Sequence, residues 1–478
     1  MRRRSTAFLS LLLLGFCLGT LACRGDGKEK EGTAERKPLA GAARGWNVVL
    51  ITVDTLRADR LGAYGYKDRP TSPRLDAELA SGVVFENAMA ARAATWPSLA
   101  SLLSGLYPRS HGVTENGYGF PDGLPTLPIQ LHGAGYRTGA FLSNMCKANH
   151  QGWDDLACTG GEDGKTVQRA IDWAQTSQGD PPQGDAQRPF FLWVHLFGAH
   201  GPYYNGGDRA DRELDPGYQG PLGPKKWQLD RIMTEKVALG ERDVRHLDAM
   251  YDAAVMGSDG LAGALLDGLK AAGRLDRTVV VFSADHGEEL YDHNGYLYHA
   301  CSVYQTTLHV PLGITAPGLL PAGARVPQTV ELIDVAPTLL ELLGLPPLPV
   351  QHGRSLVPYL ERPGEGGAGK PAFSEYGSSS INTVVRGDWK LIVNPDGFVP
   401  VCIPDAAPGH YPIGKVELYD LAKDPLETTN LADREPARVA ELTKLIRQRF
   451  ANLPRRTTGQ DVPEDLRKEL KALGYVAH

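Results

Sequence analysis

The stretch NVVLITVDTLRAD, residues 47–59, contains a continuous apolar run that stops at Asp54. Such a run is typical of a strand buried on both faces of a parallel sheet. The runs FFLWVHL (190–196) and TVVVFS (278–283) have the same pattern. Helix-like segments alternate with them, among them SDGLAGALLDGLKAAG (258–273) and ELIDVAPTLLELLGL (331–345). Strands that alternate with helices predict a doubly wound, mostly parallel α/β sheet.

The pattern of predicted elements changes after a linker-like stretch, EGGAGKP (365–371). Short strand candidates, NTVVRG, WKLIVN and VELYDL, lead to a charged helical segment, AELTKLIRQRF. This order predicts a smaller antiparallel sheet covered by a helix. We therefore expect a main domain over 46–365 and a C-terminal subdomain over 366–478.

Composition narrows the class of protein. The chain has 478 residues, of which 42% are hydrophobic, and a formal net charge of −6. Such a chain can bury a large core, and its net negative charge gives no basis for binding nucleic acid.

The first residues read as a targeting segment. MRRR precedes a short apolar run that ends at Ala22 and Cys23, and a polar stretch follows. This pattern predicts a signal peptide over 1–22, and the run is too short for a comfortable membrane span. It resembles a bacterial lipoprotein signal, which implies a lipid on Cys23, a flexible tether over 23–45 and a membrane surface of the cell envelope facing the periplasm or exterior. Plain secretion is the alternative.

Apart from Cys17 in the signal and Cys23 directly after it, four cysteines remain. They are Cys146, Cys158, Cys301 and Cys402, an even number in a chain sent to an oxidising compartment. Cys146 and Cys158 are the natural local pair.

Polar side chains follow each of the three buried runs. Asp54 ends the first, His195 and His200 belong to the second, and Asp285 with His286 follows the third. Sites in open α/β sheets form beyond the carboxyl ends of the strands. Taken singly, Asp54 reads as a helix cap and His195 as a hydrogen-bonded core histidine.

A hydroxyl completes the candidate set. In ARAATWPSLASLLSG (91–105), Thr95 precedes Pro97 and reads by itself as a cap or turn residue. A helix starting at Pro97 would aim free N–H groups at an anion beside Thr95. Together, two carboxylates, an imidazole and this hydroxyl suit a divalent cation.

Several ordered motifs carry a family resemblance. VDTLRADRLGAYGY, TWPSLASLLSGLYPRSHGV, FLWVHLFGAHGPY, VVFSADHGEEL and ELYDLAKDPLETTNLA resemble, in family order, the sulfatase branch of the alkaline phosphatase superfamily. The resemblance extends over about residues 47–432 and implies the fold of that superfamily and an enzyme that hydrolyses esters.

The resemblance also assigns roles. It implies Asp54, Asp285, His286 and Thr95 as metal ligands, with Thr95 also the nucleophile, and His200 as a substrate contact. His293 and His299 resemble histidines near the family's site, and Asn144 lies near the position of a substrate-binding pair. Thr55 replaces a second aspartate, and Leu99 replaces the arginine after the nucleophile.

Threonine has chemical consequences at this position. It cannot be oxidised to the formylglycine of true sulfatases, whereas a metal-held threonine alkoxide suits a covalent two-step displacement. One metal and the missing basic residues favour monoanionic esters, namely phosphodiesters, phosphonate monoesters or sulfates of a small molecule, glycan or lipid. Zn²⁺ or Mn²⁺ is expected, with Ca²⁺ the alternative.

Three functions remain open at this point. The first is the threonine-dependent hydrolase, the second a genuine sulfuric ester hydrolase, and the third an inactive, surface-tethered binding protein. The general acid also remains open among His200, His293 and His299.

Overall fold

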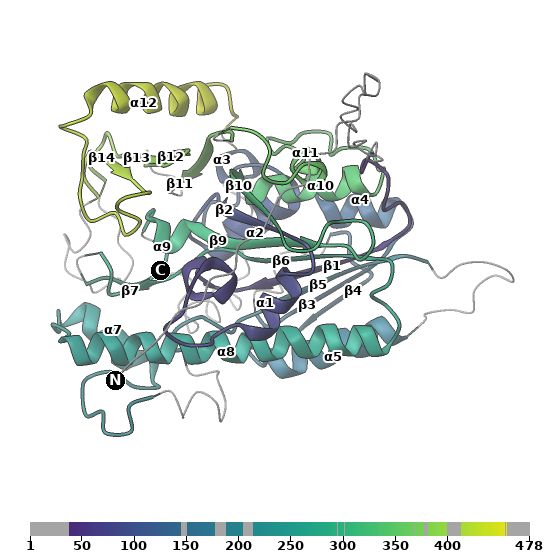
Figure 1. Ribbon diagram of the computed structural model, residues 1–478, viewed down its shortest axis with the longest axis horizontal. Helices are drawn as coiled ribbons and strands as arrows, with labels where there is room; N and C mark the ends of the chain where they lie inside the picture. The colour runs from purple at the N-terminus through teal and green to yellow at the C-terminus, as the bar shows by residue number, and fades with distance from the viewer. Residues whose placement is uncertain are drawn as a thin grey trace, which may run out of the picture. The chain divides into compact units, whose positions relative to one another are not determined.

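The structure is a computed structural model (Figure 1). It describes residues 38–144, 151–176, 188–203, 214–293, 295–300, 302–367, 369–376, 381–398, 413–454 and 456. Residues from Pro38 onward belong to one compact unit.

An eight-stranded sheet in the order β10-β2-β9-β6-β1-β5-β3-β4 forms the centre of the fold. Its strands are β1 Asn47–Val53, β2 Val83–Met89, β3 Arg137–Leu142, β4 Asp155–Cys158, β5 Phe190–Leu196, β6 Thr278–Ala284, β9 His309–Thr315 and β10 Ala324–Glu331. Only β9 pairs antiparallel with its neighbours, β2 and β6, in this sheet. The three apolar runs are the adjacent strands β6, β1 and β5, which confirms the mostly parallel α/β prediction.

Helices cover both faces of the sheet (Figure 1). One face carries α1 Pro73–Leu79, α5 Asp163–Gln175 and α8 Glu241–Ala271. The other carries α2 Thr95–Ser104, α4 Leu127–Gly133, α10 Val335–Leu342 and α11 Val357–Glu361. Helix α8 begins well before the predicted residue 258, because His246, Leu247, Met250 and Tyr251 continue its buried stripe.

Shorter elements connect these layers. They are η1 Ala58–Arg60, η2 Gly62–Tyr64, α3 Pro108–His111, α7 Lys226–Thr234, β7 Glu289–Leu290, β8 Leu297–Tyr298, α9 Gln305–Leu308 and η4 Leu332–Asp334.

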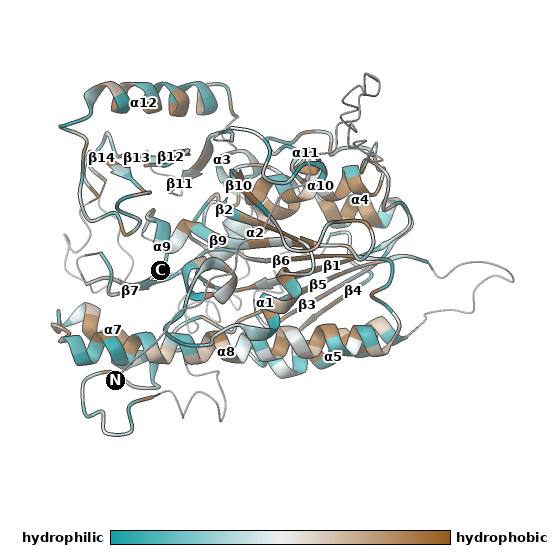
Figure 2. Cartoon of the chain, viewed as in Figure 1, coloured by the Kyte–Doolittle hydropathy of each residue, from teal (hydrophilic) through white to brown (hydrophobic). Residues whose placement is uncertain are grey.

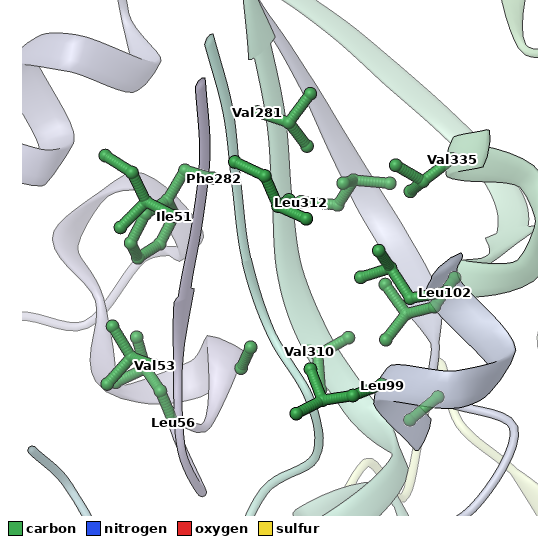
Figure 3. Close-up of a cluster of buried hydrophobic side chains, with 14 of the residues drawn as sticks. Ile51, Val53, Leu56, Leu99, Leu102, Val281, Phe282, Val310, Leu312 and Val335 are labelled. Atoms are coloured by element: carbon green, nitrogen blue, oxygen red, sulfur yellow. The ribbon is translucent and has the colours of Figure 1, made fainter. Parts of the chain in front are cut away.

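The core lies on both sides of the central strands. Val281 and Phe282, adjacent on β6, point to opposite faces: Phe282 lies near Ile51, and Val281 lies on the side of Leu312 (Figure 3). The central strands are coloured as hydrophobic along most of their length, whereas α8 and α12 mix both colours (Figure 2). Each such side chain contributes about 1.5–3 kcal/mol on full burial. Burial on both faces explains why these runs do not alternate with polar residues.

A second, antiparallel sheet has the order β11-β12-β13-β14. Its strands are β11 Ala372–Glu375, β12 Asn382–Arg386, β13 Trp389–Val393 and β14 Val416–Asp420, and α12 Pro436–Phe450 covers it. Leu442, Ile446 and Phe450 form the buried stripe of α12. The predicted small sheet with a covering helix is confirmed, and β11 is an additional strand.

The N-terminal predictions meet the structure only in part. The signal peptide and Cys23 lie outside the described residues. The end of the predicted tether differs from expectation, because Leu39 and Ala43 are buried and the Gly41 amide donates to the Glu341 carbonyl oxygen at 2.8 Å. Residues 38–45 thus pack against the end of α10. Within the described part of the chain, no helix is both long and apolar enough to cross a membrane.

Cys158, at the end of β4, forms a disulfide bond. Its predicted partner Cys146 lies outside the described residues, as do Cys301 and Cys402.

Candidate active site

Strand register brings the predicted ligands together. Val53 of β1 pairs with Ala284 of β6 in a parallel ladder, so Asp54 and Asp285 leave the sheet side by side. His195 of β5 pairs with Thr52 of β1, one position before these strand ends. The side chains of Asp54, Asp285 and His195 are fully buried. The carboxyl edge of the sheet therefore gathers charge away from water.

Asp285 is held by backbone donors. Its Oδ1 accepts the amides of His286 at 2.8 Å and Thr55 at 3.1 Å. Thr55 adopts a φ of 57°, which is unusual for a β-branched residue and occurs where the surrounding structure enforces it. Oδ2 of Asp285 is buried and has no hydrogen-bond partner among the described residues.

Two carboxylates share this buried space. Burial, and then the charge of Asp54, raises the pKa of Asp285 well above its usual range. Burial also acts on Asp54, but His200, His195, His286 and His299 outweigh it and lower the pKa of Asp54 to about 2. Asn144, the predicted substrate-binding residue, donates to Asp54 Oδ2 at 3.2 Å.

His286 faces both carboxylates and Thr95. Its Nδ1 lies 2.9 Å from the Gly287 carbonyl oxygen, which makes Nδ1 the donor of the neutral ring. Nε2 then presents its lone pair 3.3 Å from Thr95 Oγ1 and 3.4 Å from Asp285 Oδ2. It also lies 3.8 Å from Asp54 Oδ1. We call Asp54, Thr95, Asp285 and His286 the strand-end cluster.

Helix α2 presents Thr95 to this cluster. The helix begins at Thr95, two residues before the predicted start at Pro97. One turn along, Ser98 Oγ donates to the Asp285 carbonyl oxygen at 2.6 Å and ties the helix to the end of β6. The Trp96 amide donates to Asn116 Oδ1, the Ser98 amide donates to a backbone carbonyl, and Pro97 has none. The helix start therefore offers an anion fewer donors than expected.

His195 joins the cluster from β5. Its Nδ1 lies 2.9 Å from Thr52 Oγ1, which also accepts the indole N–H of Trp193 at 3.0 Å. Its Nε2 lies 3.9 Å from Asp54 Oδ2, and burial lowers the pKa of His195 to about 4. His195 is thus a buried, hydrogen-bonded histidine, as expected, that also faces Asp54. Its pairing one residue before the strand end is the signal that could have identified it.

Two of the three other predicted histidines lie beside the cluster. The His299 ring lies 4.6 Å from the His286 ring and 5.0 Å from the His200 ring, centroid to centroid. His299 Nδ1 lies 3.0 Å from Glu288 Oε1, and this carboxylate outweighs burial and raises the pKa of His299. His200 Nδ1 faces the Gly201 carbonyl oxygen, and burial lowers the pKa of His200 to about 4. Glu288, which the sequence analysis left without a role, therefore orients His299.

His293 is not brought to the cluster. Its Nδ1 pairs with Glu289 Oε2 at 2.9 Å, and its Nε2 lies 3.0 Å from the carbonyl oxygen of Leu426. The ring stacks on Tyr304 with centroids 3.8 Å apart. Because both ring nitrogens are engaged toward the C-terminal part of the chain, the expected place of His293 in the site is corrected.

The donor set fits a divalent cation. Ligand atoms of Asp54, His195 and Asp285 all lie within 4.8 Å of one another. Burying the carboxylates of Asp54 and Asp285 side by side costs free energy unless a positive charge lies nearby. Asp285 Oδ2 also has no hydrogen-bond partner among the described residues. Carboxylate oxygens, imidazole nitrogens and a hydroxyl are ligands that divalent cations accept.

Comparisons with known proteins identify the family of the chain. The Sulfatase family model matches residues 46–345. Arylsulfatase K of Danio rerio is 33% identical over 216 residues, which cover 43% of this chain; the chain thus spans only 38% of that relative. A protein named Sulfatase, of Formosa agariphila, is 25% identical, with 88% of each chain covered.

Solved structures share the fold. A protein in complex with its substrate D-glucosamine-2-N,6-O-disulfate aligns with a TM-score of 0.69 at 19% identity, over 87% of this chain and all of the other. The phosphonate monoester hydrolase of Agrobacterium radiobacter aligns with a TM-score of 0.65 at 21% identity, over 85% of this chain and 95% of the other. The family match extends over more than half of the chain and includes the strand-end cluster. The chain therefore belongs to the Sulfatase family.

Proposed function

We propose that this chain hydrolyses monoanionic esters by covalent catalysis through Thr95. One observation carries the proposal: Thr95 Oγ1 is fully buried, 3.3 Å from His286 Nε2, beside the carboxylates of Asp54 and Asp285. A hydroxyl in such a setting can serve as a ligand and a nucleophile at once.

The proposed cofactor is one Zn²⁺ or Mn²⁺, with Ca²⁺ the alternative. Asp54, Asp285, His286 and Thr95 would hold it, and His195 is a further candidate ligand. When bound, such an ion lowers the pKa of a coordinated hydroxyl and neutralises anionic oxygens. Imidazole nitrogen in the set favours Zn²⁺ or Mn²⁺ over Ca²⁺.

The residues of the chain then divide the reaction. Thr95 would react as the alkoxide, because a cation held by the strand-end cluster would lower the pKa of its hydroxyl and let its proton pass to water. Its Oγ1 forms a bond to the phosphorus or sulfur of the ester, and the bond from that atom to the leaving oxygen breaks. Water next attacks the threonine ester, releases the acid product and restores Thr95.

We assign the general acid to His299. Glu288 fixes Nδ1 of His299, so Nε2 is the nitrogen left to give a proton to the leaving oxygen. A carboxylate partner stabilises the protonated ring, as in other catalytic dyads. His200 has a carbonyl partner instead and is assigned to a nonbridging oxygen of the ester. Asn144 positions Asp54.

Two classes of ester remain candidates. The threonine favours phosphodiesters and phosphonate monoesters, because a phosphothreonine can be hydrolysed by water while formylglycine chemistry is closed to it. Sulfate esters are the second candidate, favoured by the match to the Formosa agariphila sulfatase over 88% of both chains. A small molecule, a glycan or a lipid would supply the leaving oxygen.

The test uses the chain without residues 1–23, loaded separately with Zn²⁺, Mn²⁺ or Ca²⁺. Aryl sulfate, phosphodiester, phosphonate and phosphomonoester substrates are compared for wild type and Thr95→Ala. Ser101→Ala is the matched control, since Ser101 is a buried hydroxyl on the same helix that pairs with His111. We expect turnover of a monoanionic ester, lost in Thr95→Ala and kept in Ser101→Ala. Turnover that survives Thr95→Ala contradicts the proposed nucleophile, and a protein silent on every ester supports a tethered binding protein.

We also propose that a lipid on Cys23 anchors the chain to a membrane of the cell envelope. Residues 24–37 would then connect the anchor to the compact unit that begins at Pro38. Radiolabelled palmitate should enter the wild-type protein and leave Cys23→Ser unlabelled, and only the wild type should sediment with membranes. Equal labelling of both would contradict the anchor.

A further inference from the structure

Arg92 is a buried cation close to Thr95 in the sequence. It lies between the end of β2 and the start of α2, at the carboxyl edge of the sheet, and its side chain is 1% exposed. Taking a guanidinium out of water is costly unless its N–H groups and its charge are matched by partners. The partners of Arg92 therefore indicate whether its role is structural.

The partners of Arg92 are few. Nη2 lies 3.5 Å from Glu115 Oε2, and that carboxylate side chain is 44% exposed. The guanidinium stacks over Tyr376, with Cζ 4.0 Å from the ring centroid. Nε and Nη1 are buried and have no hydrogen-bond partner among the described residues.

Two other buried arginines show what a structural partner set looks like. Arg57 donates to Asp59, to Asp292 at 2.7 Å and to the Glu288 carbonyl oxygen at 3.1 Å. Arg109 pairs with Glu375, donates to Asn382 at 2.7 Å and stacks on Phe450. Arg92 differs from both, because its Nε and Nη1 donors have no hydrogen-bond partner among the described residues.

Arg92 lies close enough to His299, the proposed general acid, for its positive charge to oppose protonation of that ring. Its charge acts on His299, and Tyr296, another neighbour, lies 3.5 Å through its hydroxyl from the His299 carbonyl oxygen. Asn116, next to its partner Glu115, accepts the Trp96 amide at the start of α2. Arg92 thus borders both the nucleophile's helix and the proposed general acid.

We propose that Arg92 binds an anionic substituent of the leaving group, a carboxylate or a second sulfate. The inference rests on the proposed function, because His299 defines the leaving-group side. His200, with a cation held by the strand-end cluster, would balance the charge of the reacting group, which would leave Nε and Nη1 of Arg92 for a further anion. Charge-assisted hydrogen bonds to a guanidinium are strong and selective for planar or tetrahedral oxyanions. The substrate class is therefore an ester whose alcohol or phenol is itself acidic.

Matched aryl esters test the proposal. The 2-, 3- and 4-carboxyphenyl esters of the active acid are compared with their methyl carboxylates, in wild type, Arg92→Gln and Arg92→Lys. We expect wild type to prefer at least one free carboxylate at least tenfold in kcat/KM, chiefly through KM. That preference should vanish in Arg92→Gln and persist in part in Arg92→Lys. An equal preference in Arg92→Gln overturns the proposal.

A binding measurement separates this inference from the proposed reaction. Calorimetry with 2-, 3- and 4-hydroxybenzoate on the metal-loaded wild-type protein needs no turnover, so its result does not depend on the proposed nucleophile. We expect at least tenfold weaker binding in Arg92→Gln. Arg109→Gln is the matched control, since it removes a buried arginine whose partners are all within the chain. It should lower the melting temperature without reducing the affinity for hydroxybenzoate.

The other possible outcomes also support or overturn anion binding by Arg92. Arg92→Gln could fail to fold, and the test then uses Arg92→Lys, which keeps the positive charge. The proposal stands if Arg92→Lys binds hydroxybenzoate several fold more weakly than wild type, and it is overturned if the affinity is unchanged. Wild-type affinity in Arg92→Gln with a lowered melting temperature assigns Arg92 to structure alone, as does a wild type that binds none of the three anions. Anion binding lost in Arg92→Gln without turnover of any ester keeps Arg92 as an anion site and rejects the hydrolase proposal.

Discussion

Two buried polar clusters of this protein are built on opposite principles. In the strand-end cluster, Asp54 and Asp285 are like charges in one buried space. The second cluster, the sheet-junction network, comprises Glu289, His293, Ser302, Lys390 and Glu427. There Lys390 Nζ lies 2.7 Å from Glu427 Oε1, both fully buried, and Glu289 pairs with His293 and accepts Ser302 Oγ at 2.5 Å.

The charges of the two clusters point to different roles. A charge buried beside its opposite lowers the cost of desolvation, so the sheet-junction network can hold the small sheet to the loop after β6. A charge buried beside its like raises that cost, which either a proton on one carboxylate or a ligand of opposite charge relieves. Removing a charge should therefore stabilise the first cluster in the absence of metal and destabilise the second.

Asp285→Asn tests this contrast with the largest expected effect. The amide oxygen still accepts the Thr55 and His286 amides, while the charge is lost. Activity should fall on the order of 10³-fold or more, since a group that stabilises the transition-state charge is removed. The melting temperature of the metal-free protein should rise, because the repulsion from Asp54 ends.

Asp259→Asn is the control for that substitution. Asp259 is buried on α8 and accepts the amides of Arg74 at 3.0 Å and Leu75 at 2.7 Å, away from the strand-end cluster. Its replacement should leave kcat unchanged. A metal-free Asp285→Asn protein that melts below wild type would contradict the repulsion argument.

His299→Gln and His293→Gln form a pair from the two clusters. Loss of the general acid should lower kcat by about 10²- to 10⁴-fold. His293→Gln should change kcat by less than about threefold, because His293 lies away from the strand-end cluster. Its two ring nitrogens contact Glu289 and the carbonyl oxygen of Leu426. The loss in His299→Gln should shrink with 4-nitrophenol, a leaving group that needs no proton. Equal losses in the two variants would mean that the acid is misassigned.

Glu427→Gln tests the sheet-junction network. It leaves the Lys390 ammonium buried without its counter-charge, which typically costs about 3–5 kcal/mol of unfolding free energy. Urea denaturation measures the loss. The double variant Lys390→Met with Glu427→Gln should recover most of it, and a double variant as unstable as the single one would show that packing rather than charge is responsible.

The smallest expected effect concerns pH and a buried histidine outside both clusters. Burial lowers the pKa of His111 to about 3. Its nitrogens lie 3.0 Å from Ser101 Oγ and 3.1 Å from the Val113 amide. An unfolded chain protonates histidine near pH 6.5, so the folded state loses stability as the pH falls from about 6.5 toward 3, by up to about 1.4 kcal/mol per pH unit.

His111→Gln should remove this slope. Melting temperatures of wild type and variant between pH 4 and 8 measure it, and their difference should narrow as the pH falls. Parallel curves would show that His111 does not carry the pH dependence.

Local sequence patterns predicted the central sheet and three residues of the strand-end cluster. Three continuous apolar runs need burial on both faces, which requires a parallel sheet between helices, and residues directly after adjacent parallel strands must meet. Asp54, Asp285 and His286 follow from that rule without knowledge of any loop. Family motifs added Thr95, whose position depends on α2 being tied to the end of β6.

The remaining side chains of the site depend on contacts between distant parts of the chain. In the sequence, His293 and His299 are equivalent candidates. The chain turns between them, and Tyr298 and Ala300, which flank His299, have left-handed φ values of 76° and 70°. The direction of a side chain in such a loop depends on long-range partners such as Glu288 and Leu426. Arg92 and His195 likewise gain their meaning from neighbours far along the chain. Local sequence patterns fix which elements form, whereas the partners of a loop side chain are fixed only when those elements have packed.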